Sequence, residues 1–272
     1  MLSSTLMETL PRATPVVVFL HIPKTAGTTF NSMLSQWFRP DEVQEIMMRG
    51  MSFRLPRFPH VPKPLVAPTK IRRLRDALAS DHPPRLIRGH LDFSISRYLP
   101  ADTEYITLLR HPVDRAVSHY YHYRRQTRDP GRELAMGSTL LEWVCERGLV
   151  EMDNGQTRRL AGEMKLPIGS VSADTLEKAK RNLATRFSLV GTTERFDEFK
   201  ILAHRHFMQR DRVYPALNGD GPVPVLDAKS HEIVKQWNRF DLELHTFADE
   251  LFRRAIAQAD LGTLDPRKVA TW

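Results

Sequence analysis

The regular pattern of the chain begins with the stretch Val16-Val17-Val18-Phe19-Leu20-His21-Ile22-Pro23-Lys24-Thr25-Ala26-Gly27-Thr28-Thr29. Its first five residues form a continuous β-branched and aromatic run, which is typical of a strand buried on both faces of a parallel sheet. After a polar turn, apolar residues return at helical spacing at Phe30, Met33, Leu34, Trp37 and Phe38. This spacing predicts a helix that packs on the sheet. The stretch therefore predicts a strand, a polar loop and a helix as the opening unit.

The loop of this unit has the composition of an anion-binding turn. Backbone N–H groups and the positive end of the helix dipole converge at such a turn, where a phosphate or a sulfate would sit. Lys24 adds an ammonium group and Gly27 permits close approach of the backbone, although the lysine precedes the glycine, unlike in a Walker A loop. An anion cradle and an ordinary βα turn with a capping threonine both fit this pattern. The residues assigned to the cradle are Pro23, Lys24, Thr25, Ala26, Gly27, Thr28 and Thr29.

Beyond this unit, short apolar runs alternate with helical patterns. Strands are predicted at 85–88, 105–109 and 188–191, and helices begin near Pro112, Thr139, Ala173 and Phe196. A last helix carries Leu244, Phe247, Ala248, Leu251, Phe252 and Ala255 on one face. The alternation predicts an α/β fold with a central, mainly parallel sheet flanked by helices. Ligands of such sheets bind at the carboxyl ends of the strands.

Length and composition favour one soluble domain. The 272 residues include 40 Lys plus Arg against 32 Asp plus Glu, which gives a formal net charge of +8. A single cysteine, Cys145, excludes an intramolecular disulfide framework and a multi-thiolate metal cluster. We expect a loose leader at 1–14 and a single domain at 15–272. Because no apolar run near the start is long enough to span a bilayer, a cytoplasmic location without a transmembrane segment is expected.

A basic, proline-rich stretch occupies residues 52–75. It carries seven positive charges and no acidic residue, among Pro56, Pro59, Pro62, Pro64 and Pro68. Because proline at this density prevents regular structure, we expect an extended excursion on the surface. The stretch is either a solvated loop or the place where an anionic acceptor lies.

A second segment with phosphate-binding chemistry follows the strand predicted at 105–109. Pro112 suits the first turn of a helix, so Arg110 stands at the end of the strand and Ser118 about two turns into the helix. An arginine fork and a nearby hydroxyl together hold a phosphate group well. The two segments are specific only in combination.

Together, these segments resemble the sulfotransferases that use 3′-phosphoadenosine 5′-phosphosulfate (PAPS). Residues 21–29 are similar to the 5′-phosphosulfate loop of that family, and residues 109–118 to its 3′-phosphate segment. The chain is most similar to the branch that contains heparan sulfate 2-O-sulfotransferase and related carbohydrate sulfotransferases. The resemblance extends over most of the chain, through Asn154-Gly155-Gln156-Thr157-Arg158 and residues 189–196. It implies the P-loop-NTPase-like sulfotransferase fold.

The resemblance also implies a reaction, the transfer of the sulfuryl group of PAPS to an acceptor hydroxyl on a carbohydrate, a glycosylated molecule or a small metabolite. Lys24 would stabilise the leaving phosphate, while Arg110 and Ser118 would hold the 3′-phosphate. The turn at Gly191 and Thr192 falls where the family places part of its nucleotide pocket.

The resemblance implies a general base in the segment Arg88-Gly89-His90. His90 follows a short strand, and a neutral imidazole titrates near working pH. It matches the second histidine of a His-Gly-His element in the branch, whereas Arg88 replaces the first. Another departure is His111, which replaces an acidic residue often found between arginine and proline.

Other polar residues receive weaker assignments. Arg158, Arg159, Arg210 and Arg212 fall where relatives place parts of a ligand pocket, but solvated surface arginines are an equal alternative. No metal is expected: His204 and His206 point to different faces of a predicted helix, and no carboxylate or thiolate pattern completes a site at His119 and His122. Cys145 is interpreted as a core residue.

Two other functions compete with sulfuryl transfer. A nucleotide kinase or NTPase of related architecture would share the phosphate loop, but the Walker A order and an acidic Walker B strand are missing. A polyanion-binding module would use the basic stretch at 52–75. We expect no nucleic-acid partner, because the chain has no zinc finger, RNA-recognition signature or basic heptad helix. The sequence leaves the oligomeric state open.

Overall fold

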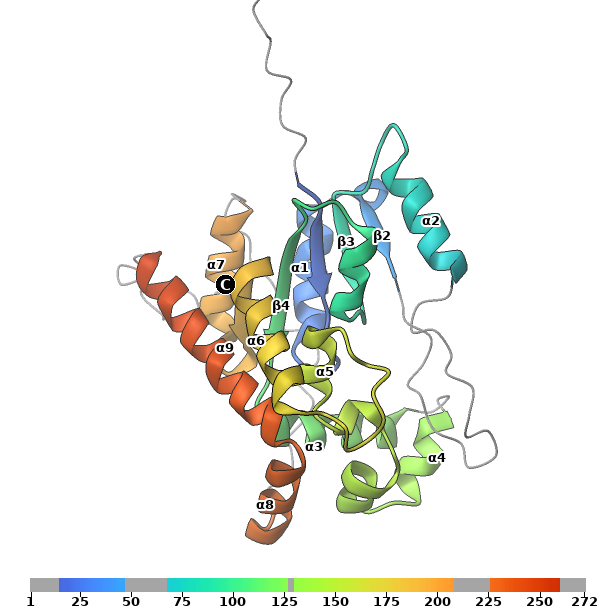
Figure 1. Ribbon diagram of the computed structural model, residues 1–272, viewed down its shortest axis with the longest axis vertical. Coiled ribbons are helices and arrows are strands. Elements are labelled where there is room, and N and C mark those ends of the chain that lie inside the picture. The colour runs from blue at the N-terminus through green and yellow to red at the C-terminus, as the bar shows by residue number, and fades with distance from the viewer. Residues whose placement is uncertain (1–14, 47–67, 127–129, 208–225, 260–272) are drawn as a thin grey trace, which may run out of the picture.

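A five-stranded parallel sheet forms the centre of the protein (Figure 1). The computed structural model describes residues 15–46, 68–126, 130–207 and 226–259. The strands are β1 (Val17–Leu20), β2 (Val43–Glu45), β3 (Leu86–Gly89), β4 (Glu104–Leu109) and β5 (Phe187–Thr192). Their order is β2-β3-β1-β4-β5, and every neighbouring pair is parallel. The predicted fold class and the strands predicted from the sequence are confirmed.

Helices cover both faces of the sheet, because alternate side chains of its central strands enter two separate cores. Val18 and Leu20 of β1 lie in one core, and Val17 and Phe19 lie in the other. The first core is covered by α2 (Pro68–Leu78), α5 (Gly155–Ala161), α6 (Ala173–Arg186) and α9 (Arg239–Gln258). The second is covered by α1 (Gly27–Trp37) and α7 (Phe196–His206), with Phe252 of α9. The continuous apolar run of β1 follows from this double burial.

A third core lies at the end of the sheet toward which the β1 arrowhead points in Figure 1. It joins α3 (Pro112–Arg125), α4 (Pro130–Met136), a π-helical turn (Glu142–Glu146) and α8 (Ala228–Trp237). Its centre is Trp143, whose side chain is fully buried. Short 3-10 segments complete the described structure: Pro40–Glu42, Phe93–Tyr98, Val150–Met152 and Thr193–Arg195.

One sequence-based prediction is wrong for the part that the structure describes. Residues 68–75 were expected to be extended, but they belong to the helix α2. Pro68 stands at the first position of that helix, where its missing N–H costs nothing, and no other proline follows before Pro83. Ile71 and Leu74 pack on the sheet while Arg72, Arg73 and Arg75 remain exposed. The predicted leader at 1–14 and the stretch 52–67 lie outside the described residues.

Within residues 15–46, 68–126, 130–207 and 226–259, no helix combines the length and the apolar character that crossing a bilayer needs.

Candidate functional site

The loop between β1 and α1 is tightly wound. Lys24 and Ala26 adopt left-handed backbone conformations, with φ of 69° and 58°. Such conformations cost about 1–3 kcal/mol each in residues other than glycine, and they persist only where surrounding contacts impose them. The buried hydroxyl of Thr25 donates to the Ile22 carbonyl (2.8 Å). That hydroxyl therefore stabilises the loop itself, whereas the sequence predicted a donor for a ligand.

Gly27 makes room for a neighbouring imidazole. A Cβ atom at this position would lie 1.8 Å from His21 Nε2. The His21 ring also stacks on Phe19, with centroids 5.4 Å apart, and its Nδ1 lies 3.5 Å from Asn31 Nδ2. The His21 ring therefore occupies the space that a side chain at position 27 would need. The close approach of a ligand to the Gly27 backbone stays a prediction.

His90 lies beside His21 at the carboxyl end of the sheet. Strands β1 and β3 pair as far as Leu20 and Gly89, so each histidine is the next residue after its strand. The two ring centroids are 4.5 Å apart. Burial, assisted by the positive charge of Arg159, lowers the pKa of His90 to about 4. Burial and the His90 ring also hold the pKa of His21 well below its ordinary value. Both imidazoles are therefore neutral near pH 7. For His90 this differs from the titration near working pH that the sequence predicts, because burial disfavours the charged imidazolium.

Arg88 has a structural position. Its Nε and Nη2 donate to Glu45 of β2 (3.0 and 2.6 Å), and its Nη1 donates to the Asn31 carbonyl and the Ser35 hydroxyl of α1 (2.9 and 2.6 Å). These bonds tie β2, β3 and α1 together. Arg88, which replaces the first histidine of the sequence pattern, therefore has a structural role. The imidazole that lies next to His90 belongs to His21.

The structure brings the two predicted phosphate segments together. Arg110 follows β4 directly, and its Nη1 donates to the Lys24 carbonyl (3.3 Å). Both side chains are half-buried. Ser118 lies in the next helix, α3, and is 1% exposed. The loop at 21–29, Arg110 and His90 thus share the carboxyl edge of the sheet, where parallel sheets bind their ligands.

The strand β5 ends next to Arg110, since Thr192 pairs with Leu109. Thr192 is fully buried, and its hydroxyl has no hydrogen-bond partner among the described residues. An unsatisfied buried hydroxyl is costly and suits a site that a polar ligand completes. Gly191 has a packing role instead, because a Cβ atom there would lie 2.2 Å from the Phe199 ring.

Four buried charged side chains form a network: Arg115, Glu151, Arg159 and Asp241. Arg115 is within 3.6 Å of Glu151 and 3.7 Å of Asp241, and Glu151 also pairs with Arg159. All four side chains are at most 6% exposed. Burial raises the pKa of Asp241. Burial also opposes the ionisation of Glu151, but Arg159 and Arg115 hold its pKa below the ordinary value.

The arginines after Gln156 differ from both alternatives posed by the sequence. Arg158 is fully buried, and it donates to the Asp153 carbonyl and side chain and to the carbonyls of Leu166 and Pro167. Arg159 Nη1 donates to the Leu91 carbonyl (2.8 Å), one residue after His90. Arg158 therefore links buried backbone segments to one another, and Arg159 supports the segment that carries His90. Arg210 and Arg212 lie outside the described residues.

The remaining histidines and the cysteine have separate surroundings. His119 Nδ1 accepts a hydrogen bond from Trp143 Nε1 (3.2 Å), and burial lowers the pKa of His119 to about 3. His206 Nε2 lies 2.8 Å from a Glu104 carboxylate oxygen, whereas the His204 ring packs on Trp37. Burial raises the pKa of the half-buried Cys145 thiol, which fits a packing residue rather than a nucleophile.

A second cluster of histidines lies near the start of α3. The backbone N–H of His111 donates to Glu194 (2.8 Å), and His245 Nε2 lies 3.1 Å from the other oxygen of that carboxylate. The His111 ring faces the His231 ring, with centroids 6.5 Å apart. Burial lowers the pKa of His111. The histidine that replaces an acidic residue thus helps to join the end of β5 to α3, α8 and α9.

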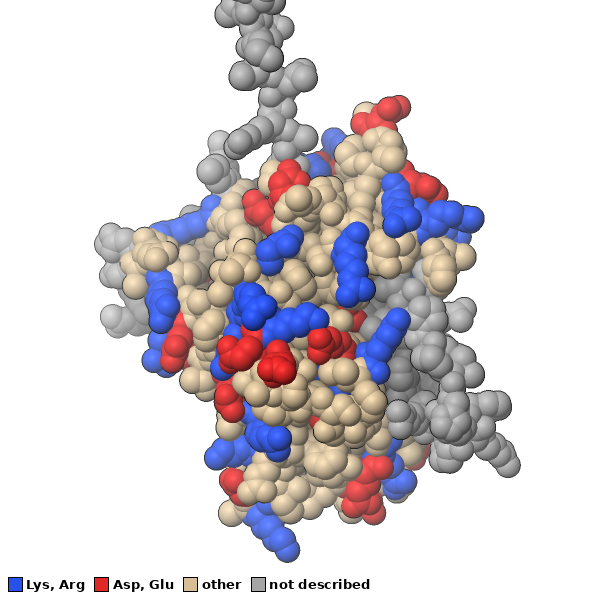
Figure 2. Space-filling view, in the orientation of Figure 1, with Lys and Arg blue, Asp and Glu red and all other residues tan. Residues whose placement is uncertain are grey.

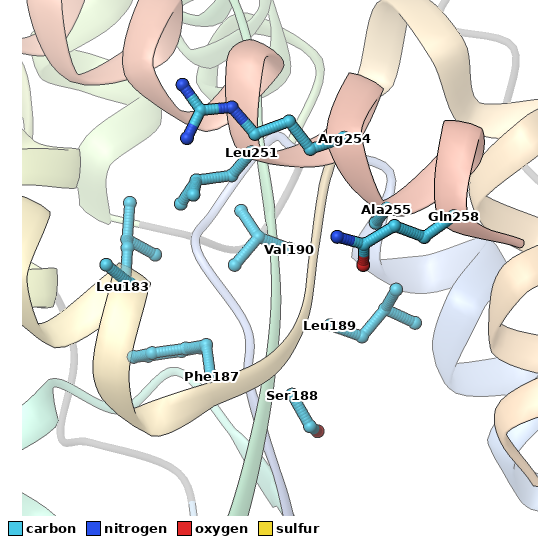
Figure 3. Close-up of a pocket in the computed structure, with 10 residues that line it drawn as sticks. Leu183, Phe187, Ser188, Leu189, Val190, Leu251, Arg254, Ala255 and Gln258 are labelled. Carbon is cyan, nitrogen blue, oxygen red and sulfur yellow. The ribbon is translucent and has the colours of Figure 1, made fainter.

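A groove of about 240 Å³ lies elsewhere, at the amino end of β5 (Figure 3). Its walls come from α6, β5 and α9, and Figure 3 shows mainly aliphatic side chains such as Leu183, Leu189 and Leu251 turned toward it. Arg254 is the one charged side chain in its lining. The groove is at the opposite end of β5 from Thr192 and has no group suited to acid–base chemistry.

Comparisons with known proteins point to one enzyme family. A family model described as galactose-3-O-sulfotransferase matches residues 2–269. "Heparin sulfate O-sulfotransferase" of Drosophila melanogaster is 28% identical over 203 residues, which cover 70% of this chain and 55% of that protein. "Galactose-3-O-sulfotransferase 2" of Mus musculus is 23% identical over 250 residues, 87% of this chain and 61% of that protein. The chain thus spans less than two thirds of these relatives.

Two solved structures show weaker similarity. A sulfotransferase from Alicyclobacillus acidocaldarius has a TM-score of 0.48 at 15% identity and covers 89% of this chain and 96% of its own. Mouse sulfotransferase SULT7A1, solved in complex with PAP, has a TM-score of 0.40 at 12% identity and covers 83% of this chain and 65% of its own. The sequence matches confirm the predicted resemblance to carbohydrate sulfotransferases, although the matched family model is named for galactose rather than for heparan sulfate.

Proposed function

Since the chain belongs to the galactose-3-O-sulfotransferase family, we propose that it transfers the sulfuryl group of PAPS to a carbohydrate hydroxyl. One observation carries this proposal. The hydrogen bond from Arg110 to the Lys24 carbonyl joins the two segments predicted to bind the two phosphate-bearing ends of the donor. The candidate base, His90, also lies at the carboxyl ends of the strands. The names of the relatives, which refer to galactose and to heparan-type chains, favour a carbohydrate as the acceptor.

The 5′ end of the donor would lie on the loop at 21–29. Lys24 and the N–H groups at the start of α1 would balance the negative charge that grows on the leaving 5′-phosphate. The acceptor oxygen attacks sulfur as the bond from sulfur to the 5′-phosphate oxygen breaks, and His90 takes the acceptor proton. The products are 3′-phosphoadenosine 5′-phosphate and the sulfated acceptor.

The 3′ end of the donor would lie beside β5. The Arg110 guanidinium suits a phosphate, since its fork donates two parallel hydrogen bonds. The unpartnered hydroxyl of Thr192 fits the same ligand, and Ser118 is the further hydroxyl that the motif assigns to it. Binding at both ends fixes the direction of the sulfuryl group, which in-line transfer requires.

The proposal is tested by supplying PAPS labelled in its sulfonate group. The purified protein is offered galactose-terminated and uronic-acid-containing oligosaccharides in the presence of EDTA, and labelled acceptor is measured. We expect label on one of the two acceptor classes. Lys24→Ala should lower the transfer rate by at least about 100-fold, because a charge that stabilises the leaving group is lost. The matched change at the exposed Lys165 should leave the rate unchanged.

The same experiment separates the alternatives. Magnesium-dependent turnover of ATP, with no transfer of label from PAPS, would replace the proposal with a nucleotide kinase or NTPase. Basic and acidic side chains alternate on the face shown in Figure 2, so this face gives no support to a polyanion-binding module. The cytoplasmic location and a metal-independent reaction stay predictions.

A further inference from the structure

The backbone of Arg110 continues past the last paired residues of the sheet. Strands β4 and β5 pair as far as Leu109 and Thr192. The next backbone groups need other partners, because a buried N–H or carbonyl without one is costly. Gln156 supplies both partners, since its Oε1 accepts from the Arg110 N–H (3.0 Å) and its Nε2 donates to the Arg110 carbonyl (2.9 Å). A side-chain amide thus extends the sheet by one residue.

Gln156 is itself rigidly held. It is fully buried in the first turn of α5, and its backbone N–H donates to Asp241 Oδ2 (3.1 Å). The N–H and the hydroxyl of the next residue, Thr157, donate to Asp241 Oδ1 (2.7 and 2.8 Å). A carboxylate of α9 therefore fixes the start of α5, and through it the amide that holds Arg110.

The fixed backbone determines where the Arg110 side chain starts. On one side Gln156 holds its peptide groups, and on the other Glu194 accepts from the N–H of His111 (2.8 Å) before Pro112 begins α3. The guanidinium is thereby placed against the loop, with Nη1 on the Lys24 carbonyl. An arginine fork binds a phosphate well only in the correct plane, so a rotation of this peptide would weaken the contact.

We propose that Gln156 is a positioning residue that gives this site its preference for nucleotides with a 3′-phosphate. The inference rests on the proposed function, since it takes Arg110 as the contact of that phosphate. Gln156 acts only through Arg110. Removing its amide should therefore weaken the binding of the 3′-phosphate and leave the rest of the nucleotide almost unaffected.

The test compares two nucleotides by calorimetry, 3′-phosphoadenosine 5′-phosphate and adenosine 5′-phosphate, which lacks the 3′-phosphate. The variants are Gln156→Met, which keeps the volume and removes the amide, and Gln156→Asn, which keeps an amide that is too short. The control is Asn182→Leu. It removes a 2.7 Å hydrogen bond from the Asn182 amide of α6 to the carbonyl of Leu160, which lies in α5 like Gln156. The ratio of the two dissociation constants is independent of the fraction of protein that is folded.

In the unaltered protein and in Asn182→Leu, we expect the dissociation constant of 3′-phosphoadenosine 5′-phosphate to be about 10- to 100-fold lower than that of adenosine 5′-phosphate. This is the range of a charge-assisted contact. In both Gln156 variants this preference should fall to about threefold or less. An unchanged preference in either Gln156 variant would overturn the inference and leave the proposed function intact. If the unaltered protein bound neither nucleotide, the proposed function would fail together with the inference.

Discussion

The two phosphate-binding segments of the proposed site are held in place by different means. The loop at 21–29 is fixed by near neighbours: the left-handed Lys24 and Ala26, and the His21 ring above Gly27. The Arg110 segment is fixed by residues far away in the chain, since Gln156 is 46 positions from Arg110 and Asp241 is 85 positions from Gln156. A short motif encodes the first geometry, whereas the second exists only in the folded chain. Changes in the second should therefore cost more stability.

The largest effect is expected from Asp241→Asn. This change removes the charge that faces Arg115 and weakens the acceptor at the start of α5. Breaking a buried ion pair on one side costs about 3–5 kcal/mol. After the change, Arg115 and Arg159 share Glu151 as the one carboxylate of the network, so a positive charge stays buried without full compensation. The measurement is the free energy of unfolding in urea.

The matched control for this change lies in the same helix. Asp249 pairs with Arg253 at 2.7 Å, but the arginine side chain is 68% exposed. Exposed pairs contribute at most about 1 kcal/mol, so Asp249→Asn should change stability little. Equal losses in the free energy of unfolding of the two variants would show that the buried network contributes no more to stability than an exposed ion pair.

A smaller effect is expected in the loop, from Gly27→Ala. The added methyl group would overlap the His21 ring, which must move from Phe19 and His90. Overpacking of this kind costs about 1–3 kcal/mol in the free energy of unfolding. The control is Gly137→Ala, where the nearest atom to an added Cβ would be the Glu133 carbonyl oxygen at 3.4 Å. If both variants unfolded at the same urea concentration, His21 would not depend on Gly27.

The same contrast explains what the sequence could predict. The parallel sheet, the strand–loop–helix unit at 16–38 and the position of Arg110 after β4 all followed from local patterns. The contacts of Gln156 and Asp241, and that of His21 with His90, join residues far apart in the chain. A short stretch of sequence therefore does not predict them. A signal for His21 was nonetheless available, because two histidines follow two predicted strands that pair side by side in a parallel sheet.

The errors in the prediction also have physical causes. The proline density of 52–75 predicts an extended segment, but the last of these prolines, Pro68, occupies the first position of a helix, which proline tolerates. Arg158 and Arg159 are fully or almost fully buried, whereas arginines are seldom buried unless they are paired. Their partners Asp153 and Glu151 are five and eight residues upstream, and acidic residues at that distance were a sign of internal pairing.

A further stability effect should appear on acidification, through His119. Its pKa is about 3 in the folded protein against 6.5 for an exposed histidine, so the unfolded chain takes up a proton that the folded protein refuses. Stability therefore falls as the pH drops from 6.5 toward 3, by up to about 1.4 kcal/mol per pH unit from this group. His119→Asn keeps an acceptor for Trp143 and should remove that part of the slope.

The test of this expectation is the free energy of unfolding in urea between pH 6 and pH 4.5. The control is His82→Asn, a matched change at an exposed histidine. Parallel curves for the unaltered protein and His119→Asn would contradict the assigned role of His119.

The central claim is that His90 takes the acceptor proton at an edge where other residues bind the donor. The most direct measurement is the rate of sulfuryl transfer by His90→Gln, together with its dissociation constant for 3′-phosphoadenosine 5′-phosphate and with His82→Gln as the control. We expect a transfer rate at least about 100-fold lower, which is the usual contribution of a general base, and an affinity within about twofold of that of the unaltered protein. An undiminished rate, or an affinity that falls as far as the rate, would contradict the central claim.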